Sequence, residues 1–167
     1  MRRMWPRNVD AIGGLADVSM RQLRFDDAIA QYSEYVGLEP GKAEAHFNLG
    51  LALAARDREQ DAIGHFARAV EIDPGDSTMR ETYGLALVSV RRLDDAVVQY
   101  RAALAIEPGR VSTHNALGAV LGTQGKREEA AAQFRRSLEL DPENAETRAT
   151  AAAVLGAAAL NAPVRPR

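Results

Sequence analysis

The sequence has no cysteine, few aromatic residues and no long run of apolar residues. The absence of cysteine excludes disulfides and thiolate zinc sites. No stretch of about 18 apolar residues occurs, so the sequence predicts no membrane-spanning helix. Arg2 and Arg3 are not followed by the apolar segment of a secretory signal, and no signal peptide is expected. These absences favour a soluble, cytoplasmic protein.

Positive charge is not in excess either. The 167 residues carry a formal net charge of −2, with 21 Lys and Arg against 23 Asp and Glu. Proteins that bind nucleic acids usually present a basic face to the phosphates. The charge balance therefore argues against a nucleic-acid partner.

What the sequence does contain is a period of 34 residues. Prolines, alanines and aromatic residues each recur at this spacing, at Pro40, Pro74, Pro108 and Pro142, at Ala28, Ala62, Ala96 and Ala130, and at Tyr32, Phe66, Tyr100 and Phe134. Three independent residue classes keep one period, which is hard to obtain by chance. A fixed period of this length indicates stacked structural repeats.

These positions resemble the tetratricopeptide repeat (TPR) family, whose signature spreads small, aromatic and proline positions over two antiparallel helices. The second repeat matches that signature at Leu49, Gly50, Ala62, Phe66, Ala69 and Pro74. The resemblance covers Val9 to Asn144. It implies an all-α fold, a right-handed superhelical solenoid of helix-turn-helix repeats with a C-terminal capping helix. It does not imply one particular function, because a fold of this kind serves many unrelated partners.

The period divides the chain into segments. The predicted order is a disordered lead (1–8), a degenerate repeat (9–42), three regular repeats (43–76, 77–110 and 111–144), a capping helix (145–161) and a disordered tail (162–167). The predicted repeat helices are 9–22, 25–38, 43–56, 59–72, 77–90, 93–106, 111–124 and 127–140. Proline ends each second helix, because it lacks an N–H and biases the preceding residue away from helix. Glycines after three of these prolines, Gly41, Gly75 and Gly109, are expected to supply the tight turn.

Catalytic and metal-binding groups are scattered in this scheme. His46 and His114 occupy the same position in different repeats, and His65 lies on a second helix in another layer. Each histidine is expected to be a packed or exposed helix residue and not a ligand. Paired acidic residues such as Asp94 and Asp95 fall at helix starts, where negative charge favours the helix dipole. We therefore expect no enzyme activity, no cofactor and no metal site.

The resemblance places the first helix of each pair on the concave side of the solenoid. The predicted partner-binding residues on that side are Glu44, Phe47, Asn48, Leu51, Glu81, Thr82, Leu85, Val88, Asn115 and Ala119. Phe47, Leu51, Leu85 and Val88 are expected to form an apolar strip flanked by Glu44 and Glu81. The main hypothesis is a non-catalytic scaffold or adaptor that binds an extended or helical peptide segment of a partner protein in this groove.

Two alternatives stay open. The run from Ala151 to Leu160 has no polar side chain, although a terminal cap should present a polar outer face. Val154, Leu155 and Leu160 could then meet a second copy of the protein, which predicts a self-assembling structural role. The other alternative is a regulatory TPR segment of a larger enzyme.

Overall fold

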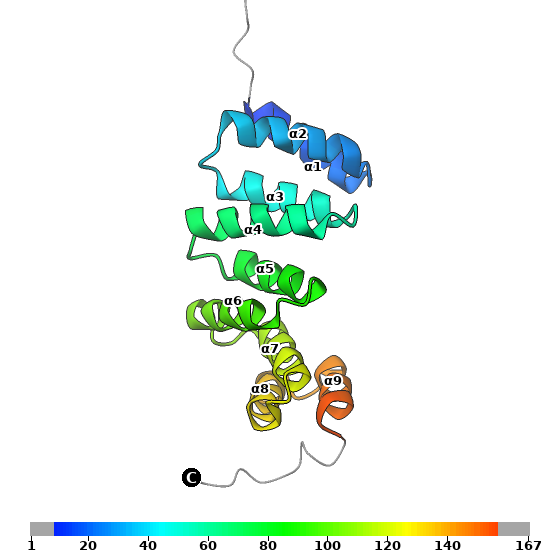
Figure 1. The fold of residues 1–167 in the computed structure, drawn as a ribbon, viewed down its shortest axis with the longest axis vertical. Coiled ribbons are helices and arrows are strands. Elements are labelled where there is room, and N and C mark those ends of the chain that lie inside the picture. The colour runs from blue at the N-terminus through cyan, green and yellow to red at the C-terminus, as the bar shows by residue number, and fades with distance from the viewer. Residues whose placement is uncertain (1–8, 157–167) are drawn as a thin grey trace, which may run out of the picture. The chain divides into compact units, whose positions relative to one another are not determined.

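The computed structural model describes residues 9–156, and this part of the chain is built from nine α-helices without a strand. The helices are labelled in Figure 1 as α1 (Val9–Arg21), α2 (Phe25–Leu38), α3 (Ala43–Ala54), α4 (Glu59–Ile72), α5 (Ser77–Ser89), α6 (Leu93–Ile106), α7 (Val111–Thr123), α8 (Arg127–Leu140) and α9 (Ala145–Leu155). The second helix of every repeat has the predicted bounds, and each first helix ends one or two residues early. None of the helices in this range is long and apolar enough to cross a membrane.

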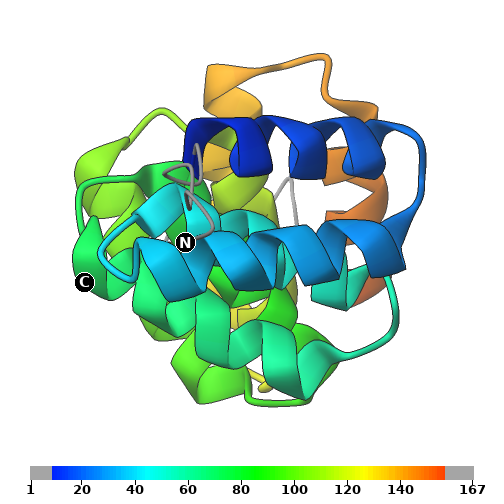
Figure 2. The same ribbon diagram turned by 90° about the horizontal axis from the view of Figure 1, so that it is seen from above.

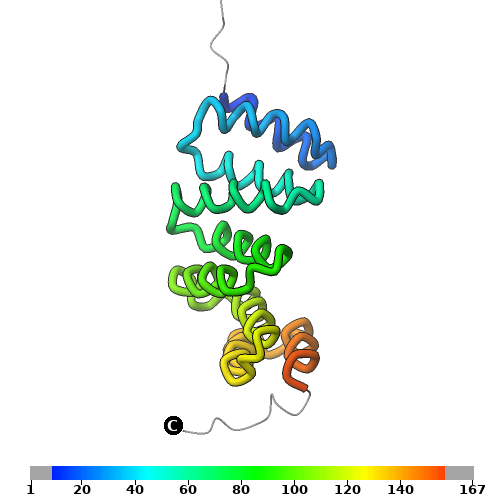
Figure 3. The backbone as a smooth tube through the Cα atoms, in the orientation of Figure 1, coloured from blue at the N-terminus to red at the C-terminus, as the bar shows by residue number. Residues whose placement is uncertain are grey.

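The chain divides into two compact units, Met1–Met79 and Arg80–Arg167, and the division falls within α5. In the first unit α1 packs on α2, α2 on α3, and α3 on α4; α1 and α2, in dark and lighter blue, lie side by side in Figure 2. In the second unit α7 packs on α6 and α8, and α9 contacts both α7 and α8. Figure 3 traces this C-terminal arrangement in yellow and orange. Each unit is therefore a stack of helices that are neighbours in sequence.

The core of a repeat is a glycine on the first helix facing an aromatic ring on the second. Phe66, Tyr100 and Phe134 are 0–1% exposed. A Cβ added to Gly50 would lie 2.6 Å from a carbon of the Phe66 ring, and the equivalent glycines of the next two repeats are as close to their rings. Burial raises the pKa of the Tyr100 hydroxyl to about 12, with a further contribution from the charge of Glu81. The 34-residue recurrence of small and aromatic residues thus reflects close packing of two helices.

The first repeat keeps this packing by a different pair of residues. Tyr35 stands where the later repeats have a small residue, and its ring lies against Gly13, whose added Cβ would be 2.9 Å away. Gly13 is buried and α1 runs through it without a break. Glycine ordinarily weakens a helix, but Gly13 makes room for the ring of Tyr35.

The turn inside each helix pair has one residue in the left-handed region. These residues are Leu23 (φ 58°), Asp57 (φ 56°), Arg91 (φ 65°) and Gly125 (φ 77°), again 34 residues apart. The N–H of the following residue donates to a carbonyl five residues back, as from Arg24 to Ser19 at 2.9 Å, which is a Schellman C-cap. Gly41, Gly75 and Gly109 do lie in the predicted turns after the prolines, but they do not have positive φ, so these turns do not require the left-handed region. The left-handed turn is the one inside each repeat.

Replacing Leu23 by glycine is expected to stabilise the protein. A non-glycine residue in the left-handed region costs roughly 1–2 kcal/mol, and the greater freedom of glycine in the unfolded chain offsets part of the gain. Leu23 is 72% exposed, so little packing is lost. We expect the free energy of unfolding to rise by about 0.5–1 kcal/mol in urea denaturation. Gly125→Leu should have the opposite sign, and a loss of stability in Leu23→Gly would contradict this account.

The capping helix is shorter than predicted. The expected range was 145–161, but α9 ends at Leu155, and Gly156 caps it with φ 86° and an N–H bond to the carbonyl of Ala152. A residue with this φ leaves the helix, so α9 ends at Leu155. The predicted lead and tail, and Leu160, lie outside the described residues.

Candidate partner-binding surfaces

The first candidate surface belongs to α3 in the first unit. Glu44 is exposed, and Phe47, Asn48 and Leu51 are half-buried. Phe47 also packs on the core, because its ring and that of Phe66 have centroids 5.7 Å apart at an interplanar angle of 56°. The surface therefore offers an exposed carboxylate, an amide and the partly accessible faces of two apolar side chains.

The second candidate surface belongs to α5, within the residues of the second unit. Leu85 is 64% exposed, the most exposed large hydrophobic side chain described on a first helix. Thr82 and Val88 are half-buried, and Glu81 precedes Leu85 by one helical turn. An exposed leucine in the middle of a well-formed helix is available for contact with a partner, although a single one is common on protein surfaces.

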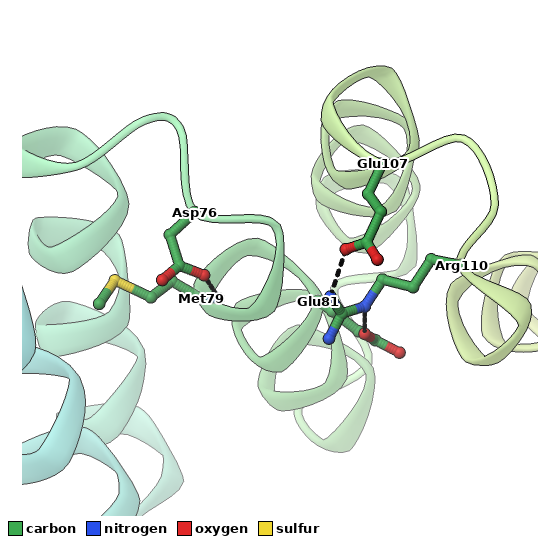
Figure 4. A network of polar contacts seen from close by, with 5 residues as sticks. All are labelled: Asp76, Met79, Glu81, Glu107 and Arg110. Atoms are coloured by element: carbon green, nitrogen blue, oxygen red, sulfur yellow. Dashed lines mark hydrogen bonds and ion pairs between the residues drawn. The ribbon is translucent and has the colours of Figure 1, made fainter.

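Glu81 is engaged by a cation of its own unit, as Figure 4 shows. The Arg110 guanidinium lies between two carboxylates, with Nε 2.5 Å from Glu81 and Nη1 2.7 Å from Glu107. Burial alone would lower the pKa of Arg110, but the hydrogen bonds and charges of the two glutamates outweigh burial and raise it. Only 19% of the Glu81 side chain and 23% of the Arg110 side chain are exposed. The negative charge of Glu81 is thus neutralised. The expectation that Glu81 gives the apolar strip an acidic flank is therefore wrong.

The fourth repeat does not offer the predicted surface. Asn115 is 8% exposed, and its Nδ2 donates to Glu146 of α9 at 3.2 Å. Ala119 remains half-buried on α7. Because α9 packs on α7, it occupies the side of the helix on which Asn115 lies. The assignment of Asn115 to an open groove is therefore wrong.

Two of the residues predicted to contact a second copy of the protein, Val154 and Leu155, pack within the second unit. Leu155 is 5% exposed, and Val154 packs so closely on α7 that a Cβ on Gly122 would meet its Cγ1 at 1.9 Å. Arg127 of α8 donates to the carbonyl of Leu155 at 2.5 Å. Leu155 therefore belongs to the core of the second unit and is not a surface for self-association.

The histidines depart from the sequence prediction as well. His65 was expected in another layer from His46, but their Nδ1 atoms are 3.1 Å apart. His114 does stay separate and meets Gln133 Oε1 at 2.8 Å through Nδ1. In residues 9–156 no group of three or more His, Cys, Asp or Glu side chains is arranged to hold a metal ion. His46 and His65 are 19 residues apart in the sequence, and His114 and Gln133, which also meet, have the same separation. This shared separation was the signal in the sequence for the His46–His65 contact.

Comparison with known proteins identifies the family. Two models described as tetratricopeptide repeat match residues 3–77 and 111–144, which together are more than half of the chain. The chain belongs to the tetratricopeptide repeat family, and the all-α repeat fold predicted from its sequence is confirmed. No curated protein matches it significantly.

Solved structures with the same fold include two of MamA and one of YrrB. A crystal structure of MamA is 28% identical, with a TM-score of 0.79 and coverage of 84% of this chain and 82% of that one. MamA from Desulfovibrio magneticus RS-1 is 17% identical, with a TM-score of 0.84 and coverage of 92% and 90%. YrrB, described as a TPR protein with an unusual peptide-binding site, is 20% identical, with a TM-score of 0.78 and coverage of 84% and 72%.

Proposed function

We propose that this chain is a non-catalytic protein-interaction scaffold of the cytoplasm, and that the surfaces of α3 and α5 bind peptide segments of a partner protein. Tetratricopeptide repeats are in general interaction modules and not catalysts. The observation that carries the proposal is Leu85, an aliphatic side chain left 64% exposed by a well-packed helix. The peptide-binding site named for YrrB supports a peptide as the ligand.

The side chains on each surface suit a peptide. On α3, Phe47 and Leu51 offer apolar contact, while the amide of Asn48 can both donate to and accept from a peptide backbone. On α5, Leu85 and Val88 provide the apolar contact. Burying one such large side chain yields about 1.5–3 kcal/mol before the ordering of the peptide is subtracted. Each surface thus supplies anchors of the kind that peptide grooves use.

Charge distinguishes the two surfaces. Glu44 of α3 is exposed, so a basic residue in the peptide is favoured there. Glu81 of α5 is already paired with Arg110, so it adds little attraction for a cation. We therefore propose apolar recognition on α5 and mixed apolar and electrostatic recognition on α3, which replaces the uniform acidic flank expected from the sequence.

Peptide selection followed by mutation tests the proposal. Peptides would be selected from a random display library against the full chain, and their affinities measured by fluorescence anisotropy. Leu85→Glu should weaken peptides bound at α5 by about 10-fold or more, because the apolar contact of one leucine is lost. Val98→Glu is the matched control, since Val98 lies on a second helix of the same unit and is 60% exposed.

Equal affinities for the Leu85→Glu and Val98→Glu proteins would remove α5 from the binding site. In that case Glu44→Lys reports on α3, where the affinity for basic peptides should fall and should recover at high salt. A library that yields no enriched peptide would contradict the proposal as a whole.

A further inference from the structure

His46 of α3 and His65 of α4 meet head-on in the first unit. Their Nδ1 atoms are 3.1 Å apart, and their ring centroids are 5.4 Å apart. The centroid separation equals the Nδ1–Nδ1 distance plus two ring radii, so each Nδ1 points along the line toward the other. Two imidazoles that shared a metal ion would instead converge on it at an angle, which would bring their centroids closer together. The geometry is that of a hydrogen bond between the rings.

The protons of the neutral pair follow from a third atom. Nε2 of His46 lies 3.2 Å from the carbonyl oxygen of Pro40, which can only accept, so this nitrogen carries a proton. Nδ1 of neutral His46 then has a lone pair, and Nδ1–H of His65 must donate to it. Nε2 of His65 is left with a lone pair. The neutral pair therefore leaves an acceptor, not a donor, at the outer nitrogen of His65.

One added proton reverses this arrangement. If the proton binds Nε2 of His65, that ring becomes an imidazolium and still donates through Nδ1 to His46. If the shared proton moves across the hydrogen bond, His46 carries the charge and His65 becomes neutral with its proton on Nε2. In both forms Nε2 of His65 is an N–H donor. A second proton would place two Nδ1–H groups against each other at 3.1 Å, so the intact pair holds one extra proton only.

We propose that the His46–His65 pair is a one-proton switch, which changes Nε2 of His65, a residue that lines a surface pocket, from hydrogen-bond acceptor to donor. His65 lines this pocket together with Ile29 and Ser33 of α2, Asp61 of α4 and Arg58, which precedes α4. A ligand group that donates a hydrogen bond suits the neutral pair, and a group that accepts one suits the protonated pair. The switch gives this face of the first unit a pH-dependent specificity that does not depend on the α3 and α5 surfaces.

Burial and the surrounding charges set the pH at which the switch operates. Burial lowers the pKa of His65 from its ordinary 6.5, the charge of a protonated His46 lowers it further, and Asp61 opposes both. Asp61 is itself paired with Arg58 at 2.6 Å, and α2 contributes only the uncharged Ser33 and Ile29 to this pocket. Because the folded pKa lies below the unfolded one, the unfolded chain takes up the proton first as pH falls. The stability due to the neutral pair is complete above the unfolded pKa and is lost as pH falls below it.

The fourth repeat supplies a matched control. His114 occupies the position of His46 and meets the Pro108 carbonyl at 3.0 Å, but its second contact is Gln133 Oε1 at 2.8 Å. Glutamine stands at the position of His65 in the other three repeats, at Gln31, Gln99 and Gln133. His65→Gln therefore converts the pair into an arrangement that the same protein already accommodates, and the variant is expected to fold.

Nitrogen-15 NMR of the imidazoles in the full chain tests the switch. At about pH 8 we expect His65 with its proton on Nδ1 and His46 with its proton on Nε2. As the pH is lowered, Nε2 of His65 should gain a proton while the Nδ1–Nδ1 hydrogen bond persists. In parallel, urea midpoints should show that the wild type loses stability between about pH 7.5 and 5.5. In His65→Gln this loss should be about half of the wild-type loss or smaller.

Three results would overturn the switch. One is a neutral His65 that carries its proton on Nε2 at high pH, because the ring would then not donate to His46. Another is simultaneous full protonation of both rings in a chain that circular dichroism shows to be folded. The third is an unchanged pH dependence in His65→Gln.

Discussion

Gly50→Ala is expected to lower the free energy of unfolding by about 1–3 kcal/mol, although alanine is normally the better helix residue. The Cβ of the alanine would lie 2.6 Å from Cε1 and 2.8 Å from Cδ1 of Phe66. The Phe66 ring is 1% exposed and cannot rotate away without displacing the core. The two helices must therefore separate, and the gain in helix propensity is smaller than the lost packing. Urea denaturation followed by circular dichroism measures the difference.

Gly64→Ala is the matched comparison on the neighbouring helix α4. An added Cβ at Gly64 has nothing within 4 Å, and the residue is exposed in the middle of a helix. Alanine there should raise the free energy of unfolding by about 0.5–1 kcal/mol through helix propensity alone. The same substitution thus has opposite signs at two glycines of the same unit. Stabilisation by both alanines would show that Gly50 is not required for close helix packing.

Ser137→Ala is expected to be destabilising by about 1–3 kcal/mol, even though alanine occupies the same position in the second and third repeats. Ser137 is fully buried, and its hydroxyl lies 2.8 Å from the Thr147 hydroxyl and 3.3 Å from the Val111 carbonyl. Thr147 is also fully buried, on α9. Removing the serine hydroxyl leaves the threonine hydroxyl without this partner in the core. The measurement is again the free energy of unfolding.

A double-mutant cycle separates the hydrogen bond from the loss of one atom. Replacing both residues, as Ser137→Ala with Thr147→Val, removes both polar groups and should restore most of the stability lost in the single variant. The two single changes are in direct contact, so a coupling energy of about 0.5–3 kcal/mol is expected. Additive effects would mean that the two hydroxyls do not depend on each other, and that their hydrogen bond does not help to hold α9 on α8.

The recurrence of residues along the chain was sufficient to predict most of the fold. The second helices have the predicted bounds because each ends before a proline and contains the alanine and aromatic positions of the period. These features depend on helix periodicity and on local chain geometry. Both can be read directly from residues that recur every 34 positions.

The contacts between particular side chains were decided by the tertiary structure. Asn115 is covered because α9 takes the position of a further first helix, and Glu81 is neutralised because Arg110 reaches back to it across 29 residues. The His46–His65 pair likewise needs two helices at a defined separation and two compatible ring orientations. The sequence by itself determined which residues form helices and which of them face a neighbouring helix. Only the packed structure decided which side chains meet, because the contacts depend on helix spacing and on rotamers that are fixed only once the neighbouring side chains are in place.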